Sequence, residues 1–157
     1  MPTLRKAAKP VSVTPATWAI RVASIEQSPD RLKVHVELSQ ECFCYTSTAL
    51  IAALLPVFPN LLEHACVNDK GDTFRVVAAN TSTPHLLEHM VIDEQSRRDA
   101  SPSKVVFVGK TTWENRARRQ ACVQLSFADA ALARQAVQVA VRALNDALLR
   151  AFAASRA

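Results

Sequence analysis

Hydrophobic residues alternate with polar ones in two neighbouring segments near the start of the chain. Trp18, Ile20 and Val22 are separated by polar or small residues, and a turn-forming segment, 28–30, follows them. In the next segment, apolar residues alternate with charged residues or histidine: Leu32, Val34, Val36 and Leu38 against Arg31, Lys33, His35 and Glu37. A period of two residues is typical of a strand with one buried face. The pattern therefore predicts a β-hairpin whose other face is solvated.

The apolar run 49–55 has the start and stop signals of a helix. It follows three hydroxyl residues, 46–48, and it ends at Pro56. The hydroxyl groups can cap the free amides of the first turn, and proline cannot continue a helix. A further short helical turn is expected within 59–64.

A longer helix is predicted after position 82. Thr83 is a natural N-cap, and Pro84 occupies the first helical position, where its missing N–H costs nothing. Arg97 and Arg98 carry charges that suit the negative end of a helix dipole, so the helix should run to about these residues. The preceding segment, 68–80, is compatible with either a strand or a helix.

The last third of the chain predicts two strands and a long helix. Residues 105–108 are all apolar and predict a buried strand, and the alternation over 120–127 predicts another. The segment 129–154 is rich in alanine and leucine and contains no helix breaker. Its large apolar residues recur every three or four positions, which predicts one face packed on the sheet: Val137, Val141, Leu144, Leu148 and Phe152.

These segments predict the order β-β-α-α-β-β-α. Strands with a single apolar face need helices to cover that face, so the expected fold class is α+β. We expect a two-layer sandwich, in which helices cover a four-stranded, mainly antiparallel sheet. A chain of 157 residues is sized for one core. A flexible basic tail is expected over 1–15 and a single domain over 16–157.

Composition and charge exclude several classes of protein. The chain has only 2 glycines and no glycine-rich phosphate loop. The net charge of +5 lies partly in the first ten residues and aromatic residues are 6%, so no nucleic-acid partner is expected. No run approaches the roughly 20 apolar residues of a membrane span, and the N-terminus lacks the apolar core of a secretory signal. We therefore expect a soluble, cytoplasmic protein without a membrane partner.

The segment 83–90 carries the residues most suggestive of chemistry. His85 and His89 are four positions apart, so on a helix they stand one above the other, with Glu88 beside them. This HxxEH spacing is the inverted zincin motif, in which two imidazoles bind Zn²⁺ and the carboxylate takes a proton from water. The alternative is an ordinary solvated helix face. The opposite side of the helix is apolar and should face the core: Leu86, Leu87, Met90 and Val91.

A catalytic zinc ion normally has three protein ligands, and the sequence leaves the third one open. His64 suits the metal best, and Glu114 is the next candidate. Asp93 lies one turn beyond His89 and could orient that imidazole without touching the metal. The cysteines, at positions 42, 44, 66 and 122, are expected to be reduced thiols that act as small buried hydrophobes.

Three segments of the chain follow known motifs in order and in spacing. Residues 58–66 (FPNLLEHAC) and 85–95 (HLLEHMVIDEQ) resemble the FPGLxEHxC and HLxEHxxxELQ segments of cyanophycin synthetase N-terminal domains. Residues 108–112 (VGKTT) are similar to the FGRTR strand end of the same domains. The resemblance covers about residues 16–152. Lys110 stands where that family has arginine, and lysine cannot form a bidentate pair with a carboxylate.

The resemblance implies two roles. In cyanophycin synthetases, further ATP-grasp and Mur-ligase-like domains build an aspartate backbone that carries arginine side chains. This chain resembles neither of those domains, so no ATP-dependent ligase activity is expected. The N-terminal domain contacts the polymer through charged surface residues, and in some members it also carries a metal-dependent hydrolase that cleaves the polymer internally. By the resemblance, Lys110 and Thr111 would contact the substrate.

Two hypotheses about function follow. The first is a zinc-dependent hydrolase of amide bonds in cyanophycin or a related polyamide. In it, His85 and His89 bind zinc, His64 or Glu114 completes the ligand set, and Glu88 is the general base. The second is a non-catalytic module that binds a charged polymer or docks on a separately encoded ligase. A homo-oligomer is expected in either case, because the C-terminal helix has more apolar surface than a small sheet can cover.

Overall fold

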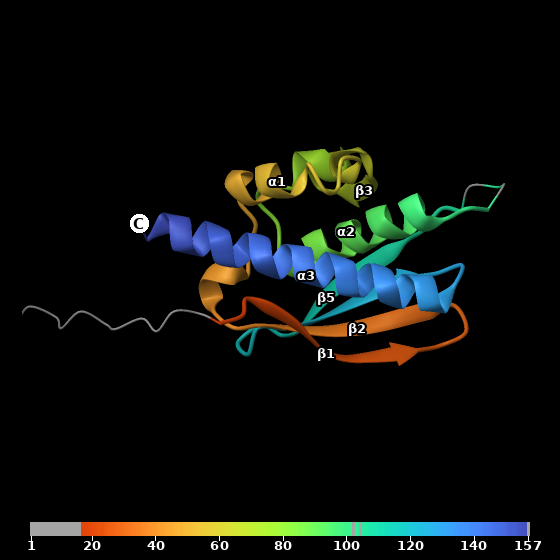
Figure 1. Cartoon of the computed structure of the whole chain (residues 1–157), viewed down its shortest axis with the longest axis horizontal. Helices are drawn as coiled ribbons and strands as arrows, with labels where there is room; N and C mark the ends of the chain where they lie inside the picture. The colour runs from red at the N-terminus through yellow and green to blue at the C-terminus, as the bar shows by residue number, and fades with distance from the viewer. Residues whose placement is uncertain (1–16, 102, 104, 157) are drawn as a thin grey trace, which may run out of the picture.

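The computed structural model describes residues 17–101, 103 and 105–156 (Figure 1). The tail predicted over 1–15 lies outside the described residues. Within the described part, buried apolar side chains form one cluster between a sheet and its helices. None of the helices in this part of the chain is long and apolar enough to cross a membrane. The α+β class is confirmed.

Four strands form an antiparallel sheet in the spatial order β1-β2-β6-β5. The alternation predicted for the second strand is observed, since Leu32 and Val34 are at most 1% exposed while Lys33 between them is exposed. One face of the sheet is therefore apolar and the other is polar. The strands are β1 (Ile20–Gln27), β2 (Arg31–Leu38), β5 (Gly109–Asn115) and β6 (Gln120–Ser126).

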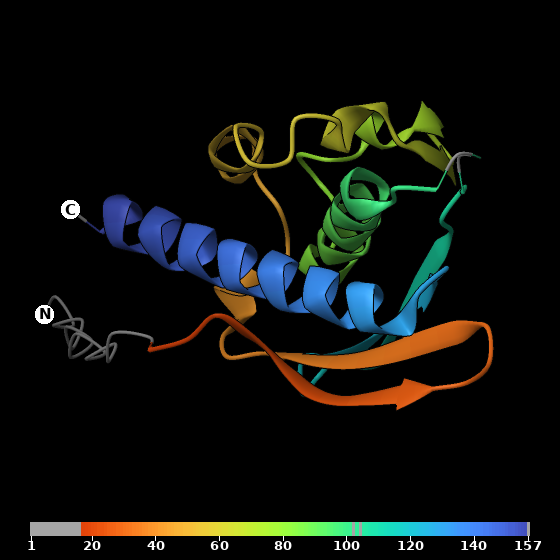
Figure 2. The ribbon, with the colours of Figure 1, turned by 45° about the vertical axis from the view of Figure 1, so that its right-hand side comes forward.

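Helices cover the apolar face of this sheet. Both α2 (Thr83–Arg98) and α3 (Ala130–Ser155) lie against it, and α1 (Thr48–Leu54) packs on α3 (Figures 1 and 2). The apolar stripe predicted for the last helix is buried at Val137, Leu144 and Leu148. The predicted order of strands and helices is observed, with one insertion before α2.

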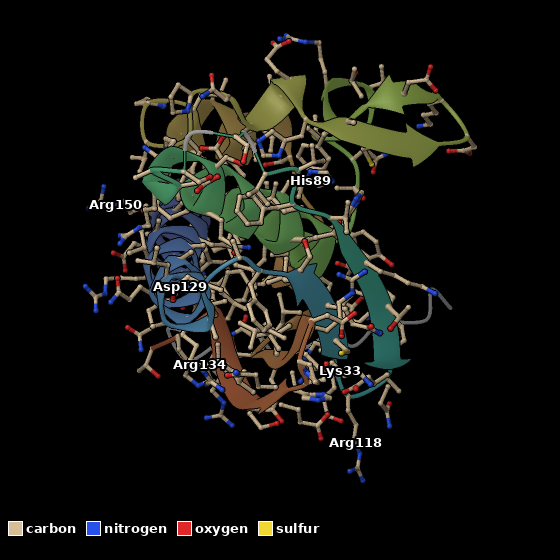
Figure 3. The ribbon with its side chains drawn as sticks, turned by 90° about the vertical axis from the view of Figure 1, so that its right-hand side faces the viewer. Lys33, His89, Arg118, Asp129, Arg134 and Arg150 are labelled. Carbon is tan, nitrogen blue, oxygen red and sulfur yellow. The ribbon has the colours of Figure 1, made fainter. Side chains whose placement is uncertain are left out.

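The insertion is a small hairpin that lies on the side of α2 away from the sheet (Figure 3). Its strands are β3 (Ala65–Asn68) and β4 (Gly71–Thr73), which pair with each other. Single 3-10 turns flank it, η2 (Leu61–Glu63) before and η3 (Phe74–Val76) after, and another, η1 (Glu41–Phe43), follows β2. The turn η2 confirms the short helical turn expected within 59–64. Because of this hairpin, α2 lies between the four-stranded sheet on one side and the hairpin on the other.

The start of α2 differs by one residue from the prediction. Ser82 is the N-cap, because its hydroxyl oxygen accepts the backbone N–H of His85 at 3.3 Å. Thr83 is therefore the first helical residue, and its buried hydroxyl donates to the carbonyl oxygen of Phe43. The prediction that Thr83 caps the helix was wrong, because its hydroxyl bonds across the core and not along the helix.

The predicted buried strand over 105–108 is also wrong. Strand β5 begins at Gly109, and Val105, Val106 and Val108 are 38%, 82% and 47% exposed. Of these four residues, only Phe107 is buried. An apolar run indicates burial only where other elements cover both of its faces, and here one side of the run borders a pocket.

Candidate functional site

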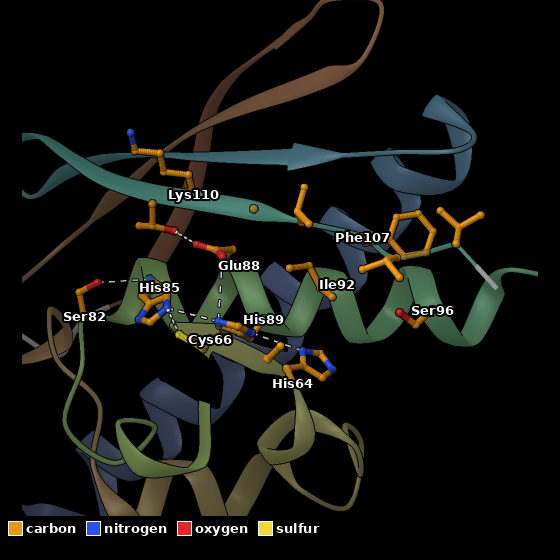
Figure 4. Close-up of a pocket in the computed structure, with 16 residues that line it drawn as sticks. His64, Cys66, Ser82, His85, Glu88, His89, Ile92, Ser96, Phe107 and Lys110 are labelled. Atoms are coloured by element: carbon orange, nitrogen blue, oxygen red, sulfur yellow. Dashed lines mark hydrogen bonds and ion pairs between the residues drawn. The ribbon is translucent and has the colours of Figure 1, made fainter. Parts of the chain in front are cut away.

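The site lies on the polar side of α2, between β5 and the segment that carries η2 and β3 (Figure 4). The apolar side of the helix faces the core as predicted, with Leu86, Leu87, Met90 and Val91 all 0% exposed. The other side is not a solvated face. Glu88 is 6% exposed and His89 is 2% exposed, because the inserted hairpin and the strand cover them. Burial of these polar groups argues against the alternative that they belong to an ordinary solvated helix face.

Three potential metal donors meet at one point of this site. The Nε2 atoms of His85 and His89 are 3.2 Å apart, and the Sγ atom of Cys66 is 3.5 Å from His85 Nε2. All three donor atoms lie within 4.8 Å of one another, so these residues could hold a metal ion. The two histidines predicted from their helical spacing are therefore brought together, and Cys66 joins them from β3.

His64 contacts the same cluster from its outer side. Its Nδ1 is 3.3 Å from Nδ1 of His89, and its Nε2 is 3.1 Å from Oδ1 of Asp93. A carboxylate can only accept, so His64 donates Nε2–H to Asp93 and its Nδ1 accepts the Nδ1–H of His89. This assignment leaves the Nε2 lone pair of His89 directed at His85 and Cys66. Asp93 thus acts on His89 through His64, not directly as expected.

His85 is oriented by a residue that lies just before the N-terminus of α2. The hydroxyl of Thr81 is 2.8 Å from its Nδ1. When this hydroxyl accepts the Nδ1–H, the Nε2 lone pair of His85 also faces the cluster. In this tautomer the two Nε2 lone pairs are 3.2 Å apart, and a cation between them would remove their repulsion; in the other tautomer His85 donates its Nε2–H to His89.

Burial keeps both imidazoles neutral. It lowers the pKa of His85, and it lowers the pKa of His89 to about 3, with the neighbouring His85 and His64 contributing further. The ring of Phe74 closes the site by stacking on His89 at 4.1 Å between centroids and meeting His85 edge-on at 5.2 Å. Neutral imidazole is the form that binds metals, so the pair is ready for a cation at neutral pH.

Glu88 is held against the sheet beside the donor cluster. The hydroxyl of Thr111 donates to Oε2 of Glu88 at 2.6 Å, while Oε1 lies 4.0 Å from His89 Nε2. Burial raises the pKa of Glu88, and the Thr111 hydrogen bond opposes that rise. A carboxylate with a raised pKa is a stronger base than an ordinary one and accepts a proton more readily. Its other oxygen, Oε1, is turned toward the cluster.

Two of the sequence-predicted residues lie away from the cluster. Glu114 projects from the polar face of the sheet, where its Oε1 is 2.8 Å from Nδ1 of His35, so it cannot supply the third donor. Lys110 lies at the rim of the pocket, and its side chain points away from Glu88 and the histidines (Figure 4). Thr111 does face the site, but its hydroxyl contacts Glu88.

Sequence reasoning missed Cys66, Thr81 and Phe74. Cys66 was expected to be a small buried hydrophobe, yet it is half-buried and its sulfur faces His85. One signal was available, since Cys66 stands only two positions after His64 in the FPNLLEHAC segment. Thr81 also had a local signal, since it stands four positions before His85 and directly before the N-cap of α2. Phe74 has no such signal, because only the path of the chain around the inserted hairpin brings it to α2.

A pocket of about 800 Å³ opens above the cluster. One end is polar and holds Cys66, His85, Glu88 and His89, and the other is bordered by Ile92 and the segment 105–108 (Figure 4). A site with a donor cluster, a held carboxylate and a cavity of this size can accommodate a small ligand or a segment of polymer.

Comparison with known proteins identifies the family. Residues 31–149 match the family described as the cyanophycin synthase-like N-terminal domain, a range that covers well over half of the chain and all of the cluster. Neither a search of curated proteins nor a search of solved structures found a match. The chain therefore belongs to the cyanophycin synthase-like N-terminal domain family.

Proposed function

We propose that this protein is a zinc-dependent hydrolase that cleaves amide bonds in cyanophycin or a related polyamide. Cys66, His85 and His89 would hold the zinc ion, and Glu88 would be the general base. His64 and Asp93 would orient His89 from outside the ligand set. The spacing of the three donor atoms is the observation that supports this proposal most directly.

Two of the three donor-to-donor distances are close to the edges of a zinc tetrahedron. With Zn–N of about 2.0–2.1 Å and Zn–S of about 2.3 Å, two nitrogens lie about 3.4 Å apart and a nitrogen and a sulfur about 3.6 Å apart. The corresponding distances here are 3.2 Å between the two Nε2 atoms and 3.5 Å between His85 Nε2 and the Cys66 sulfur. Thiolate and imidazole are also the donors that favour zinc over magnesium or calcium. Three protein ligands leave one tetrahedral position for substrate or water.

The residues around the cluster have the chemistry that amide hydrolysis needs. A zinc ion held here would supply Lewis acidity toward the amide carbonyl and toward water. Glu88 takes the proton of the attacking water through Oε1 and returns it to the leaving nitrogen. Thr111 keeps the other carboxylate oxygen occupied, which aims Oε1 at the cluster. The hairpin and Phe74 exclude water from the far side of the histidines.

Metal content of the purified, untagged protein is the first test. Near-stoichiometric zinc is expected in the wild type and none in the His85→Ala/His89→Ala double variant. If neither protein binds zinc even when it is added, the proposal fails. The chain would then be a non-catalytic module that binds a charged polymer or docks on a separately encoded ligase.

Cobalt substitution tests the choice of Cys66 over His64 as third ligand. A thiolate bound to Co²⁺ gives a charge-transfer absorption, which should be present in the wild type and absent in Cys66→Ser. His64→Ala should keep this absorption, with metal affinity lowered about 10- to 100-fold because His89 loses its orienting partner. Loss of the band in His64→Ala with retention in Cys66→Ser would reverse the assignment.

Hydrolysis of the polymer tests the role of Glu88. Glu88→Gln should keep its zinc and lose at least about 100-fold in rate, because the amide cannot accept a proton. Glu63→Gln is the matched control, since Glu63 belongs to the neighbouring motif but is exposed and paired with Arg75. An unchanged rate in Glu88→Gln would remove this residue from the reaction.

A further inference from the structure

The two ends of the pocket differ in chemistry. At the end away from the donor cluster, the lining is mainly apolar: Ile92 and the four residues of segment 105–108, with Ser96 as its polar member (Figure 4). Val105, Val106 and Val108 are 38%, 82% and 47% exposed. Consecutive large apolar side chains that remain in water beside a polar site are typical of a surface that binds a ligand.

The apolar segment is held in place beside the site. Phe107 is only 8% exposed and fixes the middle of the segment in the protein. The backbone N–H of Val108 donates to the Ser126 hydroxyl at 2.8 Å, and the Ser126 N–H donates to the Val108 carbonyl at 2.9 Å. These contacts tie the segment to the end of β6, so its valines form a wall of the pocket.

Outside the donor cluster, the described lining of the pocket offers no anion that could pair with a guanidinium group. Among its described lining residues, Glu88 is the only one with a carboxylate, and Thr111 and the donor cluster already engage it. Positions 1–16, 102, 104 and 157, which lie outside the described residues, hold no aspartate or glutamate. The other charged side chain among the described lining residues is a cation, Lys110. An arginine side chain placed here would lose water without gaining a charged partner, which is costly.

We propose that the pocket selects an amide whose neighbouring side group is apolar and uncharged, and that it disfavours the arginine-bearing unit of cyanophycin. This inference rests on the proposed function and narrows its substrate to a related polyamide or peptide. The reaction is unchanged: the oxygen of water bonds to the carbonyl carbon, the C–N bond breaks, and the proton passes through Glu88 to the leaving nitrogen. The valine wall contacts the side group next to that bond.

A pair of metal-binding ligands tests this selectivity without turnover. Leucine hydroxamate and arginine hydroxamate share the metal-binding group and differ only in the side chain. Calorimetry on the zinc-loaded protein should give leucine hydroxamate an affinity at least about ten-fold higher, since burying such a side chain is worth more than 1.4 kcal/mol. Val106→Glu should remove or reverse this preference. Val57→Glu, at another exposed valine (49% exposed) that lies outside the pocket, should leave it unchanged.

A metal-free measurement separates this inference from the proposed function. The His85→Ala/His89→Ala variant should still enhance the fluorescence of anilinonaphthalene sulfonate, and Val106→Glu in that background should lower the enhancement while Val57→Glu should not. Equal or tighter binding of arginine hydroxamate, or dye fluorescence unaffected by Val106→Glu, would overturn the apolar selectivity. Absence of zinc from the wild type would instead overturn the hydrolase and leave the dye result to decide whether the wall binds apolar groups.

Discussion

At the scale of single residues, Glu88 depends on two neighbouring positions of β5. Gly109 has no side chain, and a Cβ atom placed there would lie 2.7 Å from Glu88 Cγ and 2.9 Å from Glu88 Cδ. Thr111, two positions further along the strand, donates the hydrogen bond that holds Oε2. Gly109 therefore leaves space for the Glu88 side chain, and Thr111 fixes the orientation of its carboxylate.

Gly109→Ala should displace Glu88. The added methyl group cannot coexist with the present side-chain position, so the carboxylate must turn away from Thr111 or the strand must move. We expect a loss of about 1–3 kcal/mol in the free energy of unfolding, measured by urea denaturation, together with a large fall in hydrolysis. Zinc content should be unchanged, because Gly109 touches no proposed ligand. Full activity in Gly109→Ala would show that Glu88 does not need its observed position.

Thr111→Val should slow hydrolysis about 10- to 100-fold without removing zinc, because it frees Glu88 Oε2 and lets the carboxylate turn. The pKa of Glu88 should also rise further, since the hydrogen bond that opposes the effect of burial is lost. The acidic limb of the pH–rate profile should therefore move to higher pH. Thr112→Val is the matched control, because Thr112 is the adjacent residue of the same strand and is exposed. Equal effects of the two substitutions would mean that the hydrogen bond to Glu88 is not responsible.

At the scale of elements, the start of the long helix α3 is fixed by one side chain. Oδ1 of Asp129 accepts the backbone N–H groups of Ala131 at 2.8 Å and Leu132 at 3.1 Å. Asp129→Ala should lower the free energy of unfolding by about 1 kcal/mol, because two amides of the first turn lose their acceptor. Asp129→Asn should lose much less, since its carbonyl oxygen can still accept. Urea denaturation measures both, and equal losses would argue against capping.

Elements with a sustained period could be predicted from the sequence. The strand β2 and the helix α3 each repeat one pattern over their whole length, and both appear where they were expected. The hairpin of β3 and β4 could not be predicted, because its strands of four and three residues are too short to show a period. The run 105–108 was misassigned because its apolar residues border a cavity, which composition cannot reveal.

The same distinction applies to the candidate site. His85, Glu88 and His89 belong to one helix, so their spacing alone brings them together. Cys66 reaches them from a separate element, and its place depends on how the inserted hairpin packs on α2. Glu114 was a plausible ligand by type, but the alternation of β5 puts it on the opposite face of the sheet from Thr111. Long-range placement of this kind is decided by packing and not by local sequence.

At the scale of the whole molecule, the helices leave the polar face of the sheet without a covering layer among the described residues (Figure 2). The expected homo-oligomer remains a prediction, which the solution mass from light scattering would test. The polar face has its own titratable group at its centre. His35 lies between Glu114, 2.8 Å from Nδ1, and Glu26, 3.4 Å from Nε2, with Cys122 opposite it on β6.

This arrangement predicts a pH-dependent contribution to stability. The hydrogen bond with Glu114 is the main cause that raises the pKa of His35 in the folded protein, against a smaller opposing effect of burial. A raised folded pKa means that protonated His35 favours folding. The contribution is complete below the unfolded pKa of about 6.5 and is lost as pH rises through the folded pKa.

Glu114→Gln should therefore lower the free energy of unfolding by about 0.5 kcal/mol at a pH near 5.5, the size of an exposed ion pair, and by much less near pH 8. Urea denaturation of wild type and variant at each pH gives the difference. Acid also protonates the proposed zinc ligands, but that effect is common to both proteins and cancels in the comparison. A loss of the same size at both pH values would show that Glu114 acts through packing, independently of the charge on His35.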